Sequence, residues 1–375
     1  MSDNEAATDV TIESFDLAGV IVGETAISNV EGELGRLSYR GVDITDLVDR
    51  PFAEVAWLVL FGDTPSSAQQ LRLTQFLCQQ SELSEAERSL LSQLPAGLHP
   101  MLMLQGMVPL IELPDQETLG LGLDAEHGLL LAGKLAGLIA AYFRQEQGLA
   151  PAMGAPDRDF HYNFLSLLHG EAPDADSVRM LDAAQILQIE HSFNSGTFAG
   201  RVCASTLAPI QSVISASIGT LYGRLHGGAD QAALEMAQTI GHPDQAADYV
   251  HRCLADKVKI MGMGHREYRT VDPRAKLLKP MATKLCHDPD SRQLLDTLIA
   301  IEEACQAEFA ERGKEIWANV EFYKGAVFHS LGLPSRYFTA MFAMSRIYGY
   351  IAHFLEFRRD SRLIRPRARY QPSSR

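Results

Sequence analysis

The sequence lacks several features that mark whole classes of protein. Its 375 residues include only five cysteines, scattered without a C-x-x-C pair, so neither a disulfide framework nor a zinc site is expected. Its most apolar stretch, residues 129–143, is interrupted by Lys134 and is shorter than the roughly 20 residues that a membrane-spanning helix needs. We therefore expect a reducing compartment, no metal and no membrane partner.

Positive charge is also in short supply. The chain has 33 Lys and Arg against 47 Asp and Glu, a formal net charge of -14, which disfavours binding to nucleic acid. Its first ten residues, MSDNEAATDV, lack the basic and apolar regions of a secretory signal and the arginines of a transit peptide. A soluble, cytoplasmic protein is expected. A local group of arginines can still bind an anionic substrate.

Strand signals are sparse and confined to the start of the chain. Val20 and Val22 alternate with small residues, and Glu31-Gly32 stands where a turn could form, which predicts a short N-terminal β hairpin within residues 17–40. After Pro51 the apolar spacing becomes helical. It predicts a mainly α fold with helices near 51–62, 66–80, 84–93, 126–145, 177–193, 203–222 (stopped by Gly227-Gly228) and 326–357. The more charged segment 244–312, punctuated by prolines, suggests a smaller subdomain.

Two stretches place histidine beside glycine. In GRLHGGAD, His226 precedes two glycines, which allow a ligand to approach the backbone, although a helix C-cap would have the same sequence. In GMGHREYRTVDPR, His265 is followed by Arg266, Arg269 and Arg274. Nearby cations keep an imidazole neutral, and arginine matches carboxylates. A solvated basic loop is the alternative.

A third stretch, KEIWANVEFYKG, places Glu321 among aromatic residues. Burial there would raise the pKa of the carboxylate and favour its use as a base, whereas an outward-pointing glutamate at a helix start is the simpler alternative. Two histidines, one carboxylate and several arginines together suit carbanion chemistry on an anionic substrate.

The order and the amino-acid sequences of these stretches resemble the motifs of the citrate synthase family. EHSFNSGTFAGR, GRLHGGAD, GMGHREYRTVDPR, NVEFY, AMSRIYGYIAHFLE and RLIRPRARY follow one another from about Leu17 to about Tyr370. The opening GVIVGETAISNVEGELGRLSYRG is similar to the short bacterial citrate synthases and 2-methylcitrate synthases. The resemblance implies an almost all-α homodimer. Each subunit would have a large helical domain, residues 1–226 and 326–375, and a small helical domain, residues 227–325, that closes over the substrates.

The resemblance also implies roles for particular residues. His226 would stabilise the enol of an acyl-CoA, Glu321 would remove its α-proton, and His265 would polarise the keto oxygen of oxaloacetate. The remaining implied contacts are His191, Arg274 and Arg346 with oxaloacetate, Arg365 with the oxaloacetate of the partner subunit, and Arg269 and Lys314 with CoA. No cofactor beyond the CoA thioester substrate is implied.

One departure from the family pattern concerns the base itself. The family has Asp where this chain has Glu321, and a displacement of about 1 Å, the size of the added methylene, can reduce a rate on the order of 100-fold. Three alternatives follow. The chain makes citrate from acetyl-CoA, accepts propionyl-CoA as a 2-methylcitrate synthase, or is a catalytically impaired homologue that still binds oxaloacetate or CoA. The retention of both His226 and His265 argues against the last.

Overall fold

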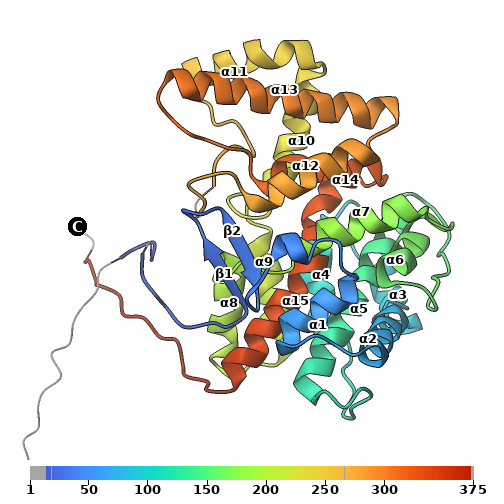
Figure 1. The fold of residues 1–375 in the computed structure, drawn as a ribbon. Helices are drawn as coiled ribbons and strands as arrows, with labels where there is room; N and C mark the ends of the chain where they lie inside the picture. The colour runs from blue at the N-terminus through green and yellow to red at the C-terminus, as the bar shows by residue number, and fades with distance from the viewer. Residues whose placement is uncertain (1–13, 18, 266, 373–375) are drawn as a thin grey trace, which may run out of the picture.

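The computed structural model describes residues 14–17, 19–265 and 267–372. They form a mainly helical fold with one small antiparallel sheet, as the sequence predicts (Figure 1). The sheet contains β1 (Ser28–Glu31), β2 (Arg36–Tyr39) and β3 (Val42–Asp43). The main helices that precede the site are α1 (Phe52–Phe61), α2 (Ser67–Gln80), α3 (Glu85–Ser92), α4 (Pro100–Met107), α5 (Leu123–Glu146), α6 (Phe160–His169), α7 (Ala175–Ile186), α8 (Ser195–Ala204) and α9 (Ile210–Leu221).

The later helices form a second group, drawn in yellow and orange at the top of Figure 1. It consists of α10 (Ala229–Ile240), α11 (Ala246–Ala255), α12 (Pro273–Leu285), α13 (Pro289–Glu311) and α14 (Val320–Ser330). Within the group, α14 packs on α10, α12 and α13, and α11 packs on α13. Contacts of α12 and α14 with α7, and of α10 with α15, join the group to the rest of the fold. The predicted division at residues 226/227 and 325/326 stays a prediction.

A long apolar helix, α15 (Phe338–Arg358), runs through the centre of the first group. It packs on α1, α5, α8 and α9, and its residues from Phe338 to Phe354 are buried on every side. A helix that is hydrophobic all round belongs in a core. The two basic side chains that this stretch contains, Arg346 and His353, are therefore carried into the interior.

Four of the predicted secondary-structure elements are wrong in detail. The helix predicted at 326–357 is interrupted: residues 326–330 belong to α14, and α15 begins only at Phe338, after Pro334. Val20 and Val22 form no strand, and the hairpin pairs residues 28–31 with 36–39. The helix predicted at 177–193 ends at Ile186, and the one at 203–222 is two helices, α8 and α9. Leu207 and Pro209 separate them. Leu207 has a φ of 64°, outside the α-helical region, and the residue before Pro209 is disfavoured in the α conformation. Because α9 already ends at Leu221, Gly227 and Gly228 do not terminate it; they lie directly before α10.

No helix in the described part of the chain is both long and apolar enough to cross a membrane.

Candidate active site

The loop carrying His265 is held against the start of α14 by strand-like pairing. The N–H of Gly264 donates to the carbonyl of Trp317 at 2.7 Å, and the N–H of Asn319 donates to the carbonyl of Gly262 at 2.9 Å. Gly262 and Gly264 have φ values of 79° and 84°, a region that side chains with a Cβ rarely adopt. The GMG sequence thus shapes the backbone that brings His265 next to the helix of Glu321.

A buried carboxylate, Asp272, joins the same two segments. It caps α12 by accepting from the N–H of Arg274, and its two oxygens accept from Nε and Nη2 of that arginine at 3.0 and 2.8 Å. Its Oδ2 also accepts from the N–H of Val320 at 3.2 Å, the residue before Glu321. One side chain therefore fixes the direction of the Arg274 guanidinium and the first turn of α14.

His265 is held as a neutral imidazole. Its Nδ1 accepts from the N–H groups of Glu267 and Tyr268 at 3.0 and 3.2 Å, so the ring proton lies on Nε2. Burial lowers the pKa of His265, and the charge of Arg274 lowers it further. Nε2 lies 3.3 Å from Nη2 of Arg274. With Nε2 protonated, both nitrogens are hydrogen-bond donors. An acceptor oxygen placed beside the pair could accept from both.

His226 is placed by the turn between α9 and α10. Its N–H donates to the carbonyl of Gly223 at 2.8 Å, and its Nε2 lies 3.3 Å from Oδ1 of Asn194, the cap of α8. The same Oδ1 accepts from the N–H of Thr197, which fixes the orientation of the amide, so the proton of His226 lies on Nε2. Burial, aided by Arg346 and opposed by Glu321, lowers the pKa of His226 to about 4.

Glu321 lies in the first turn of α14 and is partly exposed. The expectation of a raised pKa is wrong. Burial does raise the pKa of Glu321, but the positive charges of Lys324 and Arg274, with a smaller effect of the nearby His265 ring, outweigh it and lower the pKa below the usual value. The carboxylate is therefore ionised at neutral pH, which is the form that a base requires.

The other expected anion ligands lie in the interior beside this carboxylate. Arg346 is 1 % exposed and donates through Nε to the carbonyl of Gln188 at 2.7 Å, while its guanidinium carbon lies 4.7 Å from the centre of the Phe342 ring. His191 is buried, its ring centre lies 5.4 Å from that of His265, and burial with Arg274 holds its pKa well below the usual value.

Six of the nine predicted site residues therefore come together: His191, His226, His265, Arg274, Glu321 and Arg346. Arg269 and Lys314 are exposed. Arg269 lines a cavity of about 310 Å³ that also borders His265, whereas Lys314 precedes the lining residue Glu315. Arg365 is exposed on the C-terminal segment, and the N–H of the residue before it, Ile364, donates to Oγ of Ser205. Arg266 lies outside the described residues.

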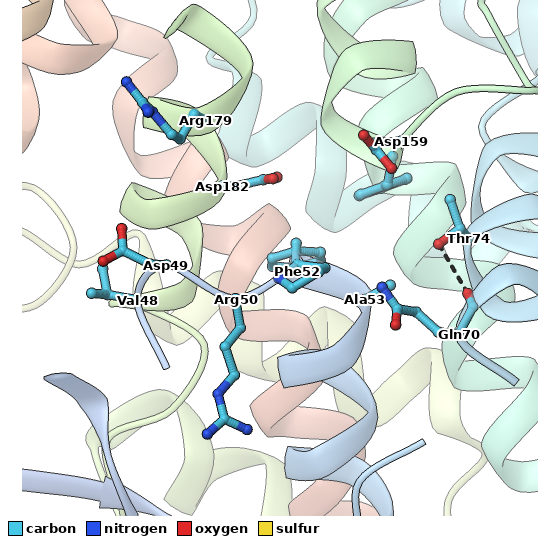
Figure 2. Close-up of a pocket in the computed structure, with 12 residues that line it drawn as sticks. Val48, Asp49, Arg50, Phe52, Ala53, Gln70, Thr74, Asp159, Arg179 and Asp182 are labelled. Atoms are coloured by element: carbon cyan, nitrogen blue, oxygen red, sulfur yellow. Dashed lines mark hydrogen bonds between the residues drawn. The ribbon is translucent and has the colours of Figure 1, made fainter. Parts of the chain in front are cut away.

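Trp317 lines the cavity beside His265, and its buried Nε1 has no hydrogen-bond partner among the described residues. A second cavity, of about 280 Å³, lies between α1, α2, α6 and α7. Figure 2 shows the Asp182 carboxylate pointing into the space beside Phe52. That cavity borders none of the nine predicted site residues.

Comparison with known proteins identifies the family. The model of the citrate synthase C-terminal domain matches residues 16–367. The chain belongs to the citrate synthase family. It is 38 % identical to the citrate synthase of Acidithiobacillus ferridurans, over 93 % of each chain. It is 35 % identical to the 2-methylcitrate synthase of Shewanella oneidensis, over 94 % of this chain and 93 % of the relative.

Solved citrate synthases share the fold. The enzyme of Thermotoga maritima superposes with a TM-score of 0.86 at 32 % identity, over 96 % of both chains. The ternary complex of carboxymethyl coenzyme A and oxaloacetate with the citrate synthase of Thermoplasma acidophilum gives a TM-score of 0.88 at 27 % identity, over 95 % of this chain and 96 % of that one. The fold and the family, predicted from the motifs, are confirmed.

Sequence reasoning missed three residues that contact the candidate site in the structure, namely Gln188, Asp272 and Lys324. The Asp-Pro pair at 272–273 carried a usable signal, because aspartate followed by proline is typical of a helix N-terminus. Lys324 was visible as a charge within an apolar helix. Gln188 had no such signal, since its role depends on contacts with α14 and α15, which are far away in the sequence.

The neutral state of His226 predicts how stability depends on pH. Its pKa falls from 6.5 to about 4 on folding, so the unfolded chain binds more protons between these values. The contribution of neutral His226 to the free energy of unfolding is present above pH 6.5 and is lost as the pH falls towards 4. The loss by pH 5 is on the order of 2 kcal/mol. Urea unfolding at pH 7 and pH 5 should show a smaller pH effect for His226→Asn than for the unmodified chain. Equal pH effects would contradict this assignment.

Proposed function

We propose that this citrate synthase family enzyme condenses acetyl-CoA with oxaloacetate and water to give citrate and CoA. The observation that carries the proposal is the ionised Glu321 carboxylate in one site with two neutral imidazoles, His226 and His265, and two buried guanidinium groups, Arg274 and Arg346. Condensation through a carbanion needs a base, a hydrogen-bond donor for the enolate oxygen and an activated electrophile. These residues offer each of the three.

Oxaloacetate would bind on the Arg274 and Arg346 side of the site. Guanidinium groups match carboxylates, and both are held rigidly, by Asp272 and by the Gln188 carbonyl. The keto oxygen would accept from Nε2–H of His265, which faces an arginine donor and has no acceptor among the residues that the structure describes. His191 would contact the same substrate. Neutral histidines suit this role because they add no charge to the two guanidinium groups.

Acetyl-CoA would be deprotonated by Glu321. The carboxylate takes a proton from the methyl carbon. The Nε2–H of neutral His226, which pairs with Oδ1 of Asn194 in the free enzyme, would turn to donate to the developing enolate oxygen. The carbanion attacks the keto carbon of oxaloacetate, whose oxygen is protonated from the side of His265. Water then cleaves the resulting citryl thioester and releases CoA, and a closed site would protect the carbanion from solvent.

The CoA moiety would extend from this centre into the cavity beside His265. Arg269 lines that cavity and Lys314 lies near it, so both could pair with phosphates. Trp317 also lines that cavity, and its Nε1–H, which is unpaired in the described part of the chain, would offer a donor to a polar group of the bound thioester. No other cofactor is required by the proposed reaction.

Release of free CoA thiol tests the proposal and the choice of acyl group. Acetyl-CoA and propionyl-CoA are each supplied with oxaloacetate, and each is also incubated alone. We expect release that depends on oxaloacetate, with a larger kcat/KM for acetyl-CoA. Faster turnover of propionyl-CoA would instead identify a 2-methylcitrate synthase; one methylene in an apolar pocket discriminates by only about 1–3 kcal/mol. No release with either thioester would overturn the proposed function in favour of a binding homologue.

We further propose a homodimer in which Arg365 completes the partner's site. The N–H of Ile364 donates to Oγ of Ser205, the C-cap of α8, so Arg365 lies near the turn that leads into α9, whereas His226 follows the end of α9. The 12 residues of α9 span about 18 Å. Exposed leucines at 102, 110 and 207, on and beside α4 and α9, provide apolar surface for a second subunit.

Hybrid dimers test this arrangement. Arg365→Ala and Glu321→Gln should each be inactive alone, because each damages both sites of its own dimer. When equal amounts are unfolded and refolded together, half of the dimers are hybrids with one intact site, so about one quarter of the unmodified activity should return. Recovery would show that the two residues act across the interface. No recovery in a mixture that contains hybrids by native mass spectrometry would place Arg365 in its own subunit's site, or in none.

A further inference from the structure

A lysine in the candidate site is completely buried. Lys324 is 0 % exposed, and its Nζ donates to Oε1 of Gln188 at 2.9 Å and lies 4.1 Å from the centre of the Phe342 ring. Removing an ammonium group from water is unfavourable by several kcal/mol unless charges and hydrogen bonds compensate. Such a group in the interior of an enzyme is a candidate for a functional role.

Its place on α14 puts it beside the base. Lys324 follows Glu321 by three residues, a spacing that places two side chains on the same face of a helix. The charge of Lys324 is the stronger of the two cationic influences on the Glu321 carboxylate, ahead of that of Arg274. Glu321 thus has a counter-cation on its own helix.

The same lysine is joined to the proposed oxaloacetate site. Gln188 accepts from Lys324 through its side chain and from Nε of Arg346 through its backbone carbonyl. The amide orientation is fixed, since Nε2 of Gln188 donates to the carbonyl of Ala184 at 2.8 Å. Phe342 also contacts both cations, with the Arg346 guanidinium 4.7 Å from its ring centre.

We propose that Lys324 is a positioning residue for the condensation: held by Gln188 against Phe342, its ammonium fixes the ionised Glu321 carboxylate relative to Arg346. This inference rests on the proposed function and assigns a task to a residue outside the reacting set. It also gives a physical reason why a glutamate can serve as base here. The longer side chain is restrained by a fixed charge, which limits the loss that a flexible carboxylate would cause.

The groups that act on Glu321 come from four segments. Lys324 lies on α14, Arg274 on α12, His265 on the preceding loop and His226 on the turn before α10. Because both histidines have lowered pKa values, the positive charges that act on Glu321 come from Lys324 and Arg274. Asp272 already neutralises Arg274 through two hydrogen bonds. Removal of Lys324 should therefore raise the pKa of Glu321.

The test is the pH profile of kcat for CoA release by Lys324→Met, Lys324→Gln and Lys324→Arg. We expect the acid limb of the Met and Gln variants to move to higher pH and kcat at neutral pH to fall about tenfold or more, with Lys324→Arg partly restoring both. Lys134→Met is the matched control, because Lys134 is also buried and ion-paired, with Glu87, but lies outside the site. It should lower the melting temperature without moving the acid limb.

Two outcomes would overturn the inference while leaving the proposed function intact. One is an unmodified enzyme that is active together with a folded Gln variant whose acid limb is unchanged. The other is an arginine variant that folds and binds oxaloacetate in calorimetry but resembles the Met variant in kcat and pH profile. If the unmodified enzyme releases no CoA, that result overturns the proposed condensation itself. It is therefore distinct from the two outcomes that overturn only the role of Lys324.

Discussion

Replacing Glu321 with glutamine should lower kcat for CoA release by about 10²–10⁴-fold, the usual contribution of a positioned base. Glutamine keeps the size of the side chain and its place in the first turn of α14, but it cannot accept the α-proton. Stopped-flow and steady-state assays of CoA thiol at saturating acetyl-CoA and oxaloacetate would measure the loss.

Oxaloacetate binding provides the control for this variant. Its Kd, measured by calorimetry, should stay within about threefold of the unmodified value, because Arg274 and Arg346 are held by Asp272 and Gln188 rather than by Glu321. A kcat within a factor of about three of the unmodified enzyme would exclude Glu321 as the base. A large loss of oxaloacetate binding with unchanged kcat would give Glu321 a binding role instead.

Replacing Arg346 with methionine should raise the Kd for oxaloacetate about 10- to 100-fold. A charge-assisted hydrogen bond contributes about 1.5–3 kcal/mol, and each 1.4 kcal/mol is a tenfold change in affinity. Methionine fills much of the same volume beside Phe342, so the loss should concern the anion more than the packing. Calorimetric titration with oxaloacetate, without acyl-CoA, measures the effect directly.

The same helix offers a matched control. Arg358 also lies over a phenylalanine four residues earlier, with its guanidinium carbon 4.8 Å from the Phe354 ring centre, and it donates to the carbonyl of Ala208. Arg358→Met removes an equivalent contact about three turns from the site. It should affect unfolding but leave the Kd for oxaloacetate within about threefold. Similar losses of affinity in both variants would show that Arg346 acts through the stability of α15.

Much of the fold was predictable because its signals are local. The helical spacing after Pro51, the turn at Gly32 and the apolar stretch that became α15 all appear in the structure. The errors arose where short-range signals compete. The segment at 203–222 has helical composition throughout, yet Leu207 and Pro209 divide it, and the alternation at Val20 and Val22 lacks a pairing partner.

The site was predictable only in part, because its electrostatics depend on distant contacts. The motifs identified His226, His265 and Glu321, and the structure brings them together. The ionisation of Glu321 could not be inferred from its aromatic neighbours, which suggest a raised pKa. Lys324 and Arg274, the second of them on another helix, reverse the direction. Likewise, the link from Gln188 to both cations exists only after folding.

Formation of a carbon–carbon bond is the central claim, and the fate of the acetyl methyl carbon tests it most directly. Acetyl-CoA labelled with ¹³C at the methyl position is incubated with oxaloacetate and the enzyme, and the products are followed by NMR. The account predicts that the label appears in a methylene group of citrate in step with free CoA, and that Glu321→Gln abolishes both. Label recovered in acetate, with CoA released at the same rate without oxaloacetate, would show simple thioester hydrolysis and contradict the account.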